Sequence, residues 1–304
     1  VDGNDEIRHR MRLGDLPIMV MSSKCPMKGL SQKQLVQKRE EANEKGGYFI
    51  LNGIERVIRL LQVPRRNHPM AIERNSYKNR GPAYSNKGVQ MRCVRPDQSS
   101  ITITLHYLNN GGTTMKFTLR KQEFLLPAIV VAKSLMDITD RELFERLLQG
   151  DRENTFLSTR LEVLLRDAKQ HGIYSAQQGR AWLGSLFRMY LPVSDVQTDE
   201  EAGLLLIQRF FFIHAESLED KLECLLLMMR KLFSFAEGNC AEDNADAMAN
   251  HELLLPGHLF NMILKEKLEE VLVSAKQTIQ REYNISRTRC VSDVRTQPLK
   301  FCQR

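Results

Sequence analysis

The sequence predicts an α+β protein with two domains, because two hydrophobic patterns occupy different parts of the chain. Between residues 89 and 119, apolar and polar residues alternate, as in strands that bury one face. From residue 124 to residue 283, apolar residues recur mainly at helical spacing. A chain of 304 residues is also long for one domain, so we expect two compact units.

The overall composition is that of a globular protein with a modest excess of positive charge. Hydrophobic residues make up 42% of the chain and charged residues 27%, which is ordinary for a protein that buries a sizeable core. The net charge of +7 favours contact with a polyanion only where the cations cluster. No apolar run reaches eighteen residues, so no transmembrane helix is expected. The start shows neither a signal peptide nor an initiator methionine, so we expect a piece of a longer protein.

Sequence motifs for metal binding and catalysis are absent. The six cysteines include no Cys-x-x-Cys pair, so we expect neither a zinc site nor a disulfide scaffold. The chain also lacks the glycine-rich phosphate motifs, the nucleophile elbow and the zinc-protease helix motif. We therefore predict no catalytic residue, no metal ligand and no cofactor in this chain.

The N-terminal part begins with an apolar run and continues with a polar segment. Residues 16–21 have the length and composition of a strand. Residues 31–45 are rich in charged side chains with opposite signs four positions apart, so we expect a solvated helix capped by Ser31. Neither segment suggests any chemistry.

A β-hairpin is the strongest local signal in the sequence. Residues 48–51 predict a short buried strand, and the pair Asn52-Gly53 suits a two-residue turn with positive φ at both positions. We expect the return strand to run to Val63. Pro64 lacks an N–H group and should stop further pairing there.

Positive charge is concentrated in and after this hairpin. Between residues 53 and 95 there are ten lysines and arginines, and only two acidic residues, Glu55 and Glu73. Such a block suits the neutralisation of phosphate charge. From local physics alone, however, a half-buried hairpin with a solvated arginine edge is the simpler explanation. The cations are Arg56, Arg59, Arg65, Arg66, Arg74, Lys78, Arg80, Lys87, Arg92 and Arg95.

Residues 75–82 are predicted to form an exposed loop, because they are polar and end in a Gly-Pro pair. Tyr77 lies here beside Lys78 and Arg80. The two cations could neutralise phosphate while the ring stacks on a base. The alternative is a mobile, solvated loop without a ligand.

Three alternating runs predict a three-stranded antiparallel meander with one face in water. Polar and glycine-containing segments at residues 97–100 and 109–112 supply the turns. His106 falls on the polar face, with no second ligand nearby in sequence, so we expect an ordinary surface histidine. The runs are residues 89–93, 101–107 and 115–119.

Helical spacing dominates the rest of the chain. Thr139 followed by Glu142 fits a capping box. Residues 201–214 are apolar on nearly all sides, which predicts burial on several sides or an interface. Residues 195–201 are expected to be a loop, and residues 237–251 an inter-domain connection. The predicted helices span residues 129–136, 139–150, 154–171, 175–190, 201–214, 220–235 and 256–283.

Several phrases of the sequence resemble one protein family. Residues 46–67, the apolar run at 16–20 and residues 227–269 are similar to the second-largest subunit of multisubunit RNA polymerases. The ending of the first phrase, residues 63–67, looks most like the RNA polymerase I version. The resemblance covers roughly residues 10 to 272 and fails in the basic segment 284–304.

The resemblance implies a division into two domains. A mixed α/β protrusion domain would be built from both chain ends, residues 1–84 and 249–304, with its last twenty or so residues unassigned. A lobe domain, residues 85–248, would be inserted between them and would combine a small antiparallel sheet with a helical bundle. Such an insertion requires only that its two ends lie close together.

The resemblance also implies a function. The chain would be part of a DNA-directed RNA polymerase, a nucleotidyltransferase of the nucleus and nucleolus that transcribes ribosomal RNA genes. It would line the DNA cleft without holding the active site, because in this family the largest subunit holds the catalytic magnesium. Its implied partners are DNA, the largest and other core subunits, and, on the lobe, an initiation-factor-like heterodimer and a small zinc-ribbon subunit. No membrane partner is implied.

Within this family reading, six cations are predicted to contact the phosphates of duplex DNA, without reading its sequence. The alternative is a protein-docking scaffold whose basic surface binds acidic segments of partner subunits. The six residues are Arg56, Arg59, Arg65, Arg66, Lys78 and Arg80.

Overall fold

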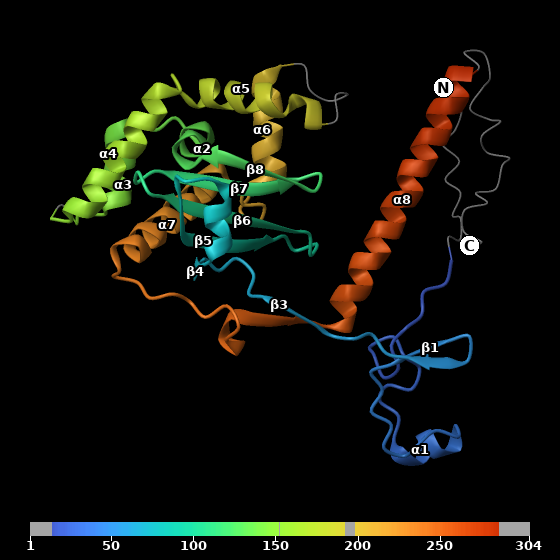
Figure 1. Cartoon of the computed structure of the whole chain (residues 1–304). Coiled ribbons are helices and arrows are strands. Elements are labelled where there is room, and N and C mark those ends of the chain that lie inside the picture. The colour runs from blue at the N-terminus through green and yellow to red at the C-terminus, as the bar shows by residue number, and fades with distance from the viewer. Residues whose placement is uncertain (1–13, 152, 192–197, 286–304) are drawn as a thin grey trace. The chain divides into compact units, whose positions relative to one another are not determined.

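The computed structural model describes residues 14–151, 153–191 and 198–285 (Figure 1). Contacts along the backbone divide the chain into two compact units. Unit 1 combines residues 1–61 and 254–304, and unit 2 is the continuous segment 62–253. Both helices and strands build the chain, which confirms the α+β class. The assignment of protrusion and lobe domains stays a prediction. Most of the basic segment 284–304 lies outside the described residues.

A five-stranded antiparallel sheet is the centre of unit 2, with the order β4-β5-β6-β7-β8. The predicted three-stranded meander is present as its middle strands. The two flanking strands were missed, because one is short and the other, residues 122–127, was taken as the approach to a helix. The strands are β4 (Met70–Glu73), β5 (Tyr84–Val94), β6 (Ser100–Leu108), β7 (Thr113–Leu119) and β8 (Gln122–Pro127).

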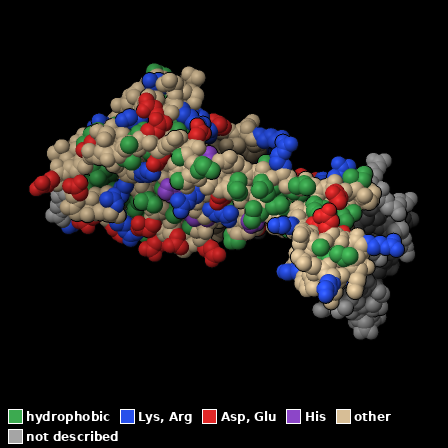
Figure 2. All heavy atoms as spheres, turned by 90° about the horizontal axis from the view of Figure 1, so that it is seen from below, with side chains coloured by type: hydrophobic (Ala, Val, Ile, Leu, Met, Phe, Trp, Pro, Cys, Tyr) green, Lys and Arg blue, Asp and Glu red, His purple; other side chains and the backbone are tan. Residues whose placement is uncertain are grey.

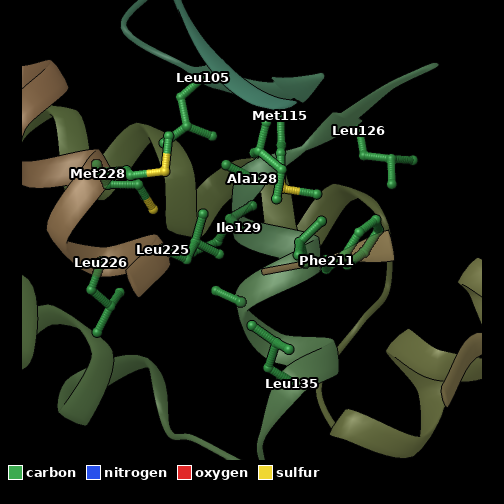
Figure 3. Packing of buried hydrophobic residues seen from close by; sticks show 14 of the residues in the cluster. Leu105, Met115, Leu126, Ala128, Ile129, Leu135, Phe211, Leu225, Leu226 and Met228 are labelled. Carbon is green, nitrogen blue, oxygen red and sulfur yellow. The ribbon is translucent and has the colours of Figure 1, made fainter. Parts of the chain in front are cut away.

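The core of unit 2 lies between one face of this sheet and two helices, α2 (Ala128–Leu135) and α7 (Leu218–Glu237). Leu105 and Met115 sit opposite each other on β6 and β7 and point toward α2 and α7 (Figure 3). Met228 of α7 packs in the same fully buried cluster. The alternation of apolar residues along the strands therefore places them all on the helix-covered face.

Four further helices complete unit 2, and they agree in place with the predicted helices. Thr139 caps the first of them, since its hydroxyl oxygen accepts a hydrogen bond from the Glu142 N–H at 3.1 Å. Part of the predicted loop at residues 195–201 lies outside the described residues, and its end already belongs to a helix. The helices are α3 (Asp140–Leu148), α4 (Thr155–Gln170), α5 (Ala176–Phe187) and α6 (Asp199–Phe210).

Helices α5 and α6 approach each other so closely that glycine is required on both. A Cβ atom on Gly184 would lie 1.7 Å from the Asp199 carbonyl oxygen, and one on Gly203 would lie 2.0 Å from the Arg180 carbonyl oxygen. Helix α6 ends at Phe210, earlier than predicted, and the buried residues 211–213 follow it as irregular chain. The apolar character of the segment thus reflects burial of both the helix and its continuation.

A buried lysine holds the end of α6. Lys221 of α7 is 2% exposed, and its ammonium donates hydrogen bonds to the carbonyl oxygens of Ile207 at 3.0 Å and Phe211 at 2.6 Å. The Phe211 N–H also donates to the Ile207 carbonyl oxygen at 3.2 Å, so the ammonium adds a second donor at this helix end. Burial lowers the pKa of Lys221 to about 8.

The other face of the sheet is partly covered by a short 3₁₀ helix, η1 (Asn75–Arg80), where an exposed loop was predicted. Tyr77 of η1 packs against Gly88 of β5, where an added Cβ would lie 2.9 Å from the Tyr77 ring. The same ring lies edge-on to His106, with ring centres 4.5 Å apart. The prediction of a surface histidine was therefore wrong: His106 is fully buried.

A two-stranded ribbon joins β3 (Leu61–Pro64) to β9 (His251–Leu254), two segments far apart in the sequence. The predicted return strand of the hairpin does not reach Val63, because β3 pairs with β9 instead. Pro64 also does not end the pairing, since the Arg65 N–H donates to the Asn250 carbonyl oxygen at 2.8 Å. The proline removes one donor, and the next residue supplies another.

Unit 1 contains the predicted hairpin, formed by β1 (Phe49–Leu51) and β2 (Ile54–Arg56). Asn52 and Gly53 have φ angles of 53° and 76°, as the predicted turn requires. The strand is not buried as expected, since only Phe49 is buried, beside Phe260.

The other helices of unit 1 are α1 (Gln32–Gln37) and the long α8 (Pro256–Ile285). The Gln34 carboxamide oxygen accepts from the Ser31 N–H at 2.9 Å, as at a capped start, but α1 is much shorter than predicted. Residues 16–21 form no strand, although the Val20 N–H donates to the Tyr48 carbonyl oxygen at 2.8 Å. Among the helices that the structure describes, none has the length and apolar character to cross a membrane.

Candidate nucleic-acid interface

The six predicted phosphate contacts belong to different units. Arg56 and Arg59 lie in unit 1, and the other four lie in unit 2. Figure 2 shows lysine and arginine side chains mixed with acidic ones over the face in view. The concentration of positive charge along the sequence therefore does not become one uninterrupted basic patch on this face.

Arg66 is held by an acidic side chain inside unit 2. The Glu252 carboxylate of β9 accepts from Arg66 Nε at 2.9 Å and from Arg92 Nη1 at 2.8 Å. Partial burial alone would raise the pKa of Glu252, but the two arginine hydrogen bonds outweigh it and lower the pKa below its ordinary value. This bridge ties the β3–β9 ribbon to β5, so Arg66 has a structural role.

Arg80 is also held within unit 2. Its Nη2 donates to Glu123 Oε2 at 2.9 Å, and Lys116 Nζ donates to the other carboxylate oxygen at 2.5 Å. The hydrogen bonds from Lys116 and Arg80 lower the pKa of Glu123. The Arg80 guanidinium also lies 5.5 Å from the centre of the Tyr77 ring.

Tyr77 is not available to stack on a base, contrary to prediction. Its side chain is only 5% exposed, because the ring fills the space over Gly88. Burial raises the pKa of Tyr77. The ring serves instead to attach η1 to the sheet and to give Arg80 a surface to lie on.

Two further cations of the basic block donate hydrogen bonds to carbonyl oxygens at the C-terminal ends of helices. Lys87 Nζ donates to the Phe235 carbonyl oxygen at 3.0 Å, near the end of α7. Arg95 Nη2 donates to the Gln208 carbonyl oxygen at 2.9 Å, near the end of α6. Cations at helix C-termini are favoured by the unpaired carbonyl groups and the helix dipole.

The remaining cations of the block are exposed. Their side chains make no hydrogen bond or ion pair with any residue that the structure describes, which leaves their charge available to a ligand. Arg74, which was not among the predicted contacts, belongs to this set, and its exposure could not be read from the charge pattern. The set comprises Arg56 and Arg59 in unit 1 and Arg65, Arg74 and Lys78 in unit 2.

The neighbourhood of Arg65 is electropositive. Burial lowers the pKa of His68, and the nearby charges of Lys231 and Arg65 lower it further, although Asp243 acts in the opposite direction. Lys231 itself donates to Asp243 at 2.6 Å. A protonated His68 is therefore disfavoured, and Arg65 remains the exposed charge at this position.

No group of three or more histidine, cysteine, aspartate or glutamate side chains within the described part of the chain could hold a metal ion. Cys93 is fully buried, and burial raises the pKa of its thiol to about 12, which makes it unreactive. The structure thus offers exposed cations as its candidate functional groups.

Comparison with known proteins identifies the family. Residues 2–298 match the family model described as RNA polymerase beta subunit. The chain is 45% identical to the DNA-directed RNA polymerase I subunit rpa2 of Dictyostelium discoideum over 271 residues, 89% of this chain and 24% of that protein.

Two further relatives are RPA2 subunits of DNA-directed RNA polymerase I. The protein of Eremothecium gossypii is 45% identical over 286 residues, 93% of this chain and 24% of its own length. The human protein is 44% identical over 264 residues, 87% of this chain and 23% of its own length. The chain therefore spans about a quarter of the length of the curated relatives it matches. It belongs to the RNA polymerase beta subunit family and is a fragment of an RNA polymerase I second-largest subunit.

Proposed function

We propose that this chain helps RNA polymerase I to hold duplex DNA during transcription of ribosomal RNA genes. The observation that carries the proposal is the set of exposed cations that bond to none of the described residues, above all Arg65 and Lys78 in unit 2. The relatives are named as subunits of DNA-directed RNA polymerase I, which supports DNA as the polyanion.

The mechanism is electrostatic and independent of DNA sequence. An arginine or lysine at a phosphate releases condensed counterions, and each such contact adds about 0.9 to the slope of log affinity against log salt concentration. The side chains described here would guide and retain DNA, and they would take no part in bond formation. We propose that the catalytic magnesium is held by the largest subunit and that this fragment alone is inactive.

The structure changes which predicted residues we assign to DNA. Arg65 and Lys78, with Arg56 and Arg59 of unit 1, keep their charges free for phosphate. Arg66 and Arg80 are positioning residues, because their guanidinium groups are already bonded to Glu252 and Glu123. They fix the segments that present the exposed cations.

The remaining proposals follow from the family. The protrusion and lobe would line the DNA cleft, and the lobe would dock an initiation-factor-like heterodimer and the small zinc-ribbon subunit. The largest subunit and the other core subunits would be its permanent partners. The assembled enzyme would act in the nucleus, within the nucleolus.

The test replaces the exposed pair in the assembled polymerase, as Arg65→Ala with Lys78→Ala. We expect the salt slope of DNA binding to fall by about 1.8, since two contacts are lost. A matched control, Arg166→Gln with Lys169→Gln, removes two exposed cations of α4. A slope that stays unchanged in the first variant, or falls equally in the control, would contradict the proposal.

A second function, protein docking, is favoured by the apolar surface of unit 1. Val57, just after the hairpin, is 76% exposed, and Leu272 of α8 is 69% exposed. Exposed apolar side chains that together form a contiguous patch mark surfaces that bind protein. Replacement by serine, as Val57→Ser with Leu272→Ser, should weaken assembly of the polymerase. Normal assembly of this variant would contradict a docking role for these two side chains.

A further inference from the structure

The turn between β7 and β8 has an unusual sequence for its geometry. Leu119 pairs with Gln122, so Arg120 and Lys121 alone form the turn. Their φ angles are 49° and 66°, which a two-residue hairpin turn needs at both central positions. Asn-Gly or Asp-Gly is preferred there, because side chains with a bulky Cβ substituent adopt positive φ only with strain. Arginine and lysine at both positions are thus unfavourable for folding.

Both turn side chains are exposed, and the nearest acidic residue in sequence does not neutralise them. Glu123 is two positions past the turn, but its carboxylate oxygens are occupied by Lys116 at 2.5 Å and Arg80 at 2.9 Å. Neither Arg120 nor Lys121 forms a hydrogen bond or ion pair with a residue in the described ranges. Two adjacent positive charges are therefore held in water at the tip of a rigid hairpin.

Other exposed cations lie at the same end of the sheet. Strands β5 and β7 both pair antiparallel with β6, so they finish at the same end. Arg65 lies there, because the neighbouring Arg66 and Asn67 pair with Arg92 near the end of β5. Arg209 lies there too, next to Gln208, whose carbonyl oxygen accepts from Arg95.

Acidic residues at this end are engaged within the fold: Glu252 is bonded to Arg66 and Arg92, and Asp97 lies in the turn that follows β5. Its Oδ1 accepts from the Ser99 hydroxyl at 2.6 Å and from the Ser99 N–H at 3.1 Å. These bonds fold the carboxylate back onto its own turn. We call the end of the sheet that carries the exposed cations Arg65, Arg120, Lys121 and Arg209 the cationic end.

We propose that the Arg120-Lys121 turn contacts the sugar-phosphate backbone of duplex DNA at the cationic end. This inference rests on the proposed function and adds two contact residues that the charge pattern near the hairpin did not indicate. A two-residue turn gives its side chains a fixed origin, so less flexibility is lost on binding than from a long loop. Local strain at functional positions persists where the surrounding structure enforces it, and here two paired strands enforce it.

The test uses the assembled polymerase with Arg120→Asn and Lys121→Gly. This variant has the preferred turn sequence, so the unfolding midpoint should stay the same or rise. The salt slope of duplex DNA binding should fall by about 1.8. The exchange Arg120→Lys with Lys121→Arg keeps both charges and should keep the slope, which separates charge from turn geometry.

The control removes two cations at the opposite end of the sheet. The β6–β7 turn there approaches α4, since a Cβ on Gly112 would lie 3.3 Å from Asp167. Arg166→Gln with Lys169→Gln on α4 should leave the slope unchanged.

An unchanged slope in the turn variant overturns the inference. If the variant instead loses a partner subunit at an unchanged slope, the turn binds protein and the inference is wrong. If the Arg65→Ala, Lys78→Ala variant lowers the slope while the turn variant does not, only the turn assignment fails. If neither lowers it, the proposed function fails as well.

Discussion

Units 1 and 2 bury their apolar side chains very differently. The main hydrophobic cluster, from Ala71 to Phe235, lies entirely in unit 2. In the described part of unit 1, few side chains are buried, such as Phe49 and Leu259, and many large apolar ones are exposed on the hairpin and α8. Burial of apolar area is the main favourable term in folding, at about 25 cal/mol per Å². Among the described residues, unit 2 therefore gains much more from apolar burial than unit 1 does.

The comparison also separates two uses of arginine and lysine. In unit 2, cations such as Lys221 and Arg92 satisfy carbonyl groups or carboxylates inside the fold. Other cations, such as Lys78, stay in water. The bonded cations stabilise unit 2, which carries the exposed ones. Removal of a bonded cation should therefore lower stability, whereas removal of an exposed cation should weaken DNA binding.

The largest expected effect is the loss of stability caused by a substitution in the hydrophobic core of unit 2. Phe117→Ala should lower the free energy of unfolding by about 4 kcal/mol, because its buried ring packs among Phe124, Phe187 and Phe211. The matched change in unit 1, Leu272→Ala, should cost less than about 0.5 kcal/mol. Urea unfolding followed by circular dichroism measures both. Similar losses of unfolding free energy in the two variants would contradict the difference in burial between units 1 and 2.

Acidification should weaken unit 2 through His106. Burial, with the nearby charges of Arg80 and Lys116, lowers the pKa of His106 to about 3. Between pH 6.5 and pH 3 the unfolded chain binds a proton there that the folded unit does not, so stability falls as pH falls. From pH 6.5 to pH 5 the loss is about 2 kcal/mol, from 1.5 pH units at 1.36 kcal/mol each.

The measurement compares the chain with His106→Phe by urea unfolding at pH 7 and pH 5. The variant should lose less stability than the unchanged chain, because its ring cannot titrate between the two Tyr neighbours. An identical pH dependence in both proteins would show that His106 titrates normally in the folded state.

The smallest expected effect concerns Glu252, whose carboxylate bridges Arg66 and Arg92. Glu252→Gln should cost about 1 kcal/mol of stability, because Arg66 and Arg92 each lose a charged acceptor. It should also steepen the salt dependence of DNA binding, since positive charge is set free near Arg65. Thermal unfolding and DNA binding at graded salt measure the two effects. An unchanged salt dependence would show that these arginines do not lie near DNA.

Much of unit 2 could be predicted from the sequence, because alternating and helical patterns report directly which face is buried. The strands at residues 101–107 and 115–119 and the capped helix after Thr139 are examples. Pairing between distant segments could not be predicted. Leu61–Pro64 looked like the end of a hairpin, whereas it pairs with β9, since no local signal shows which partner is nearest in space.

The candidate site was harder to predict, because a sequence records charge and not its partners. Arg65 and Arg66 are adjacent and chemically identical, yet only Arg66 reaches a carboxylate, that of Glu252, which lies 186 positions away. Tyr77 looked exposed among polar neighbours and is buried, because Gly88 leaves room for its ring. The positive φ angles at Arg120 and Lys121 depend on strand register, so only the structure shows them.

The most direct test compares exposed with bonded cations in the assembled polymerase. One variant changes Arg56, Arg59, Arg65 and Lys78 to glutamine, and the other changes Arg66 and Arg80 to glutamine. The first should lower the salt slope of duplex DNA binding by about 3.6, for four lost contacts, and leave stability nearly unchanged. The second should lower stability with a much smaller change of slope. Equal slope changes per charge in the two variants, or none in the first, would contradict the assignment of the exposed cations to DNA.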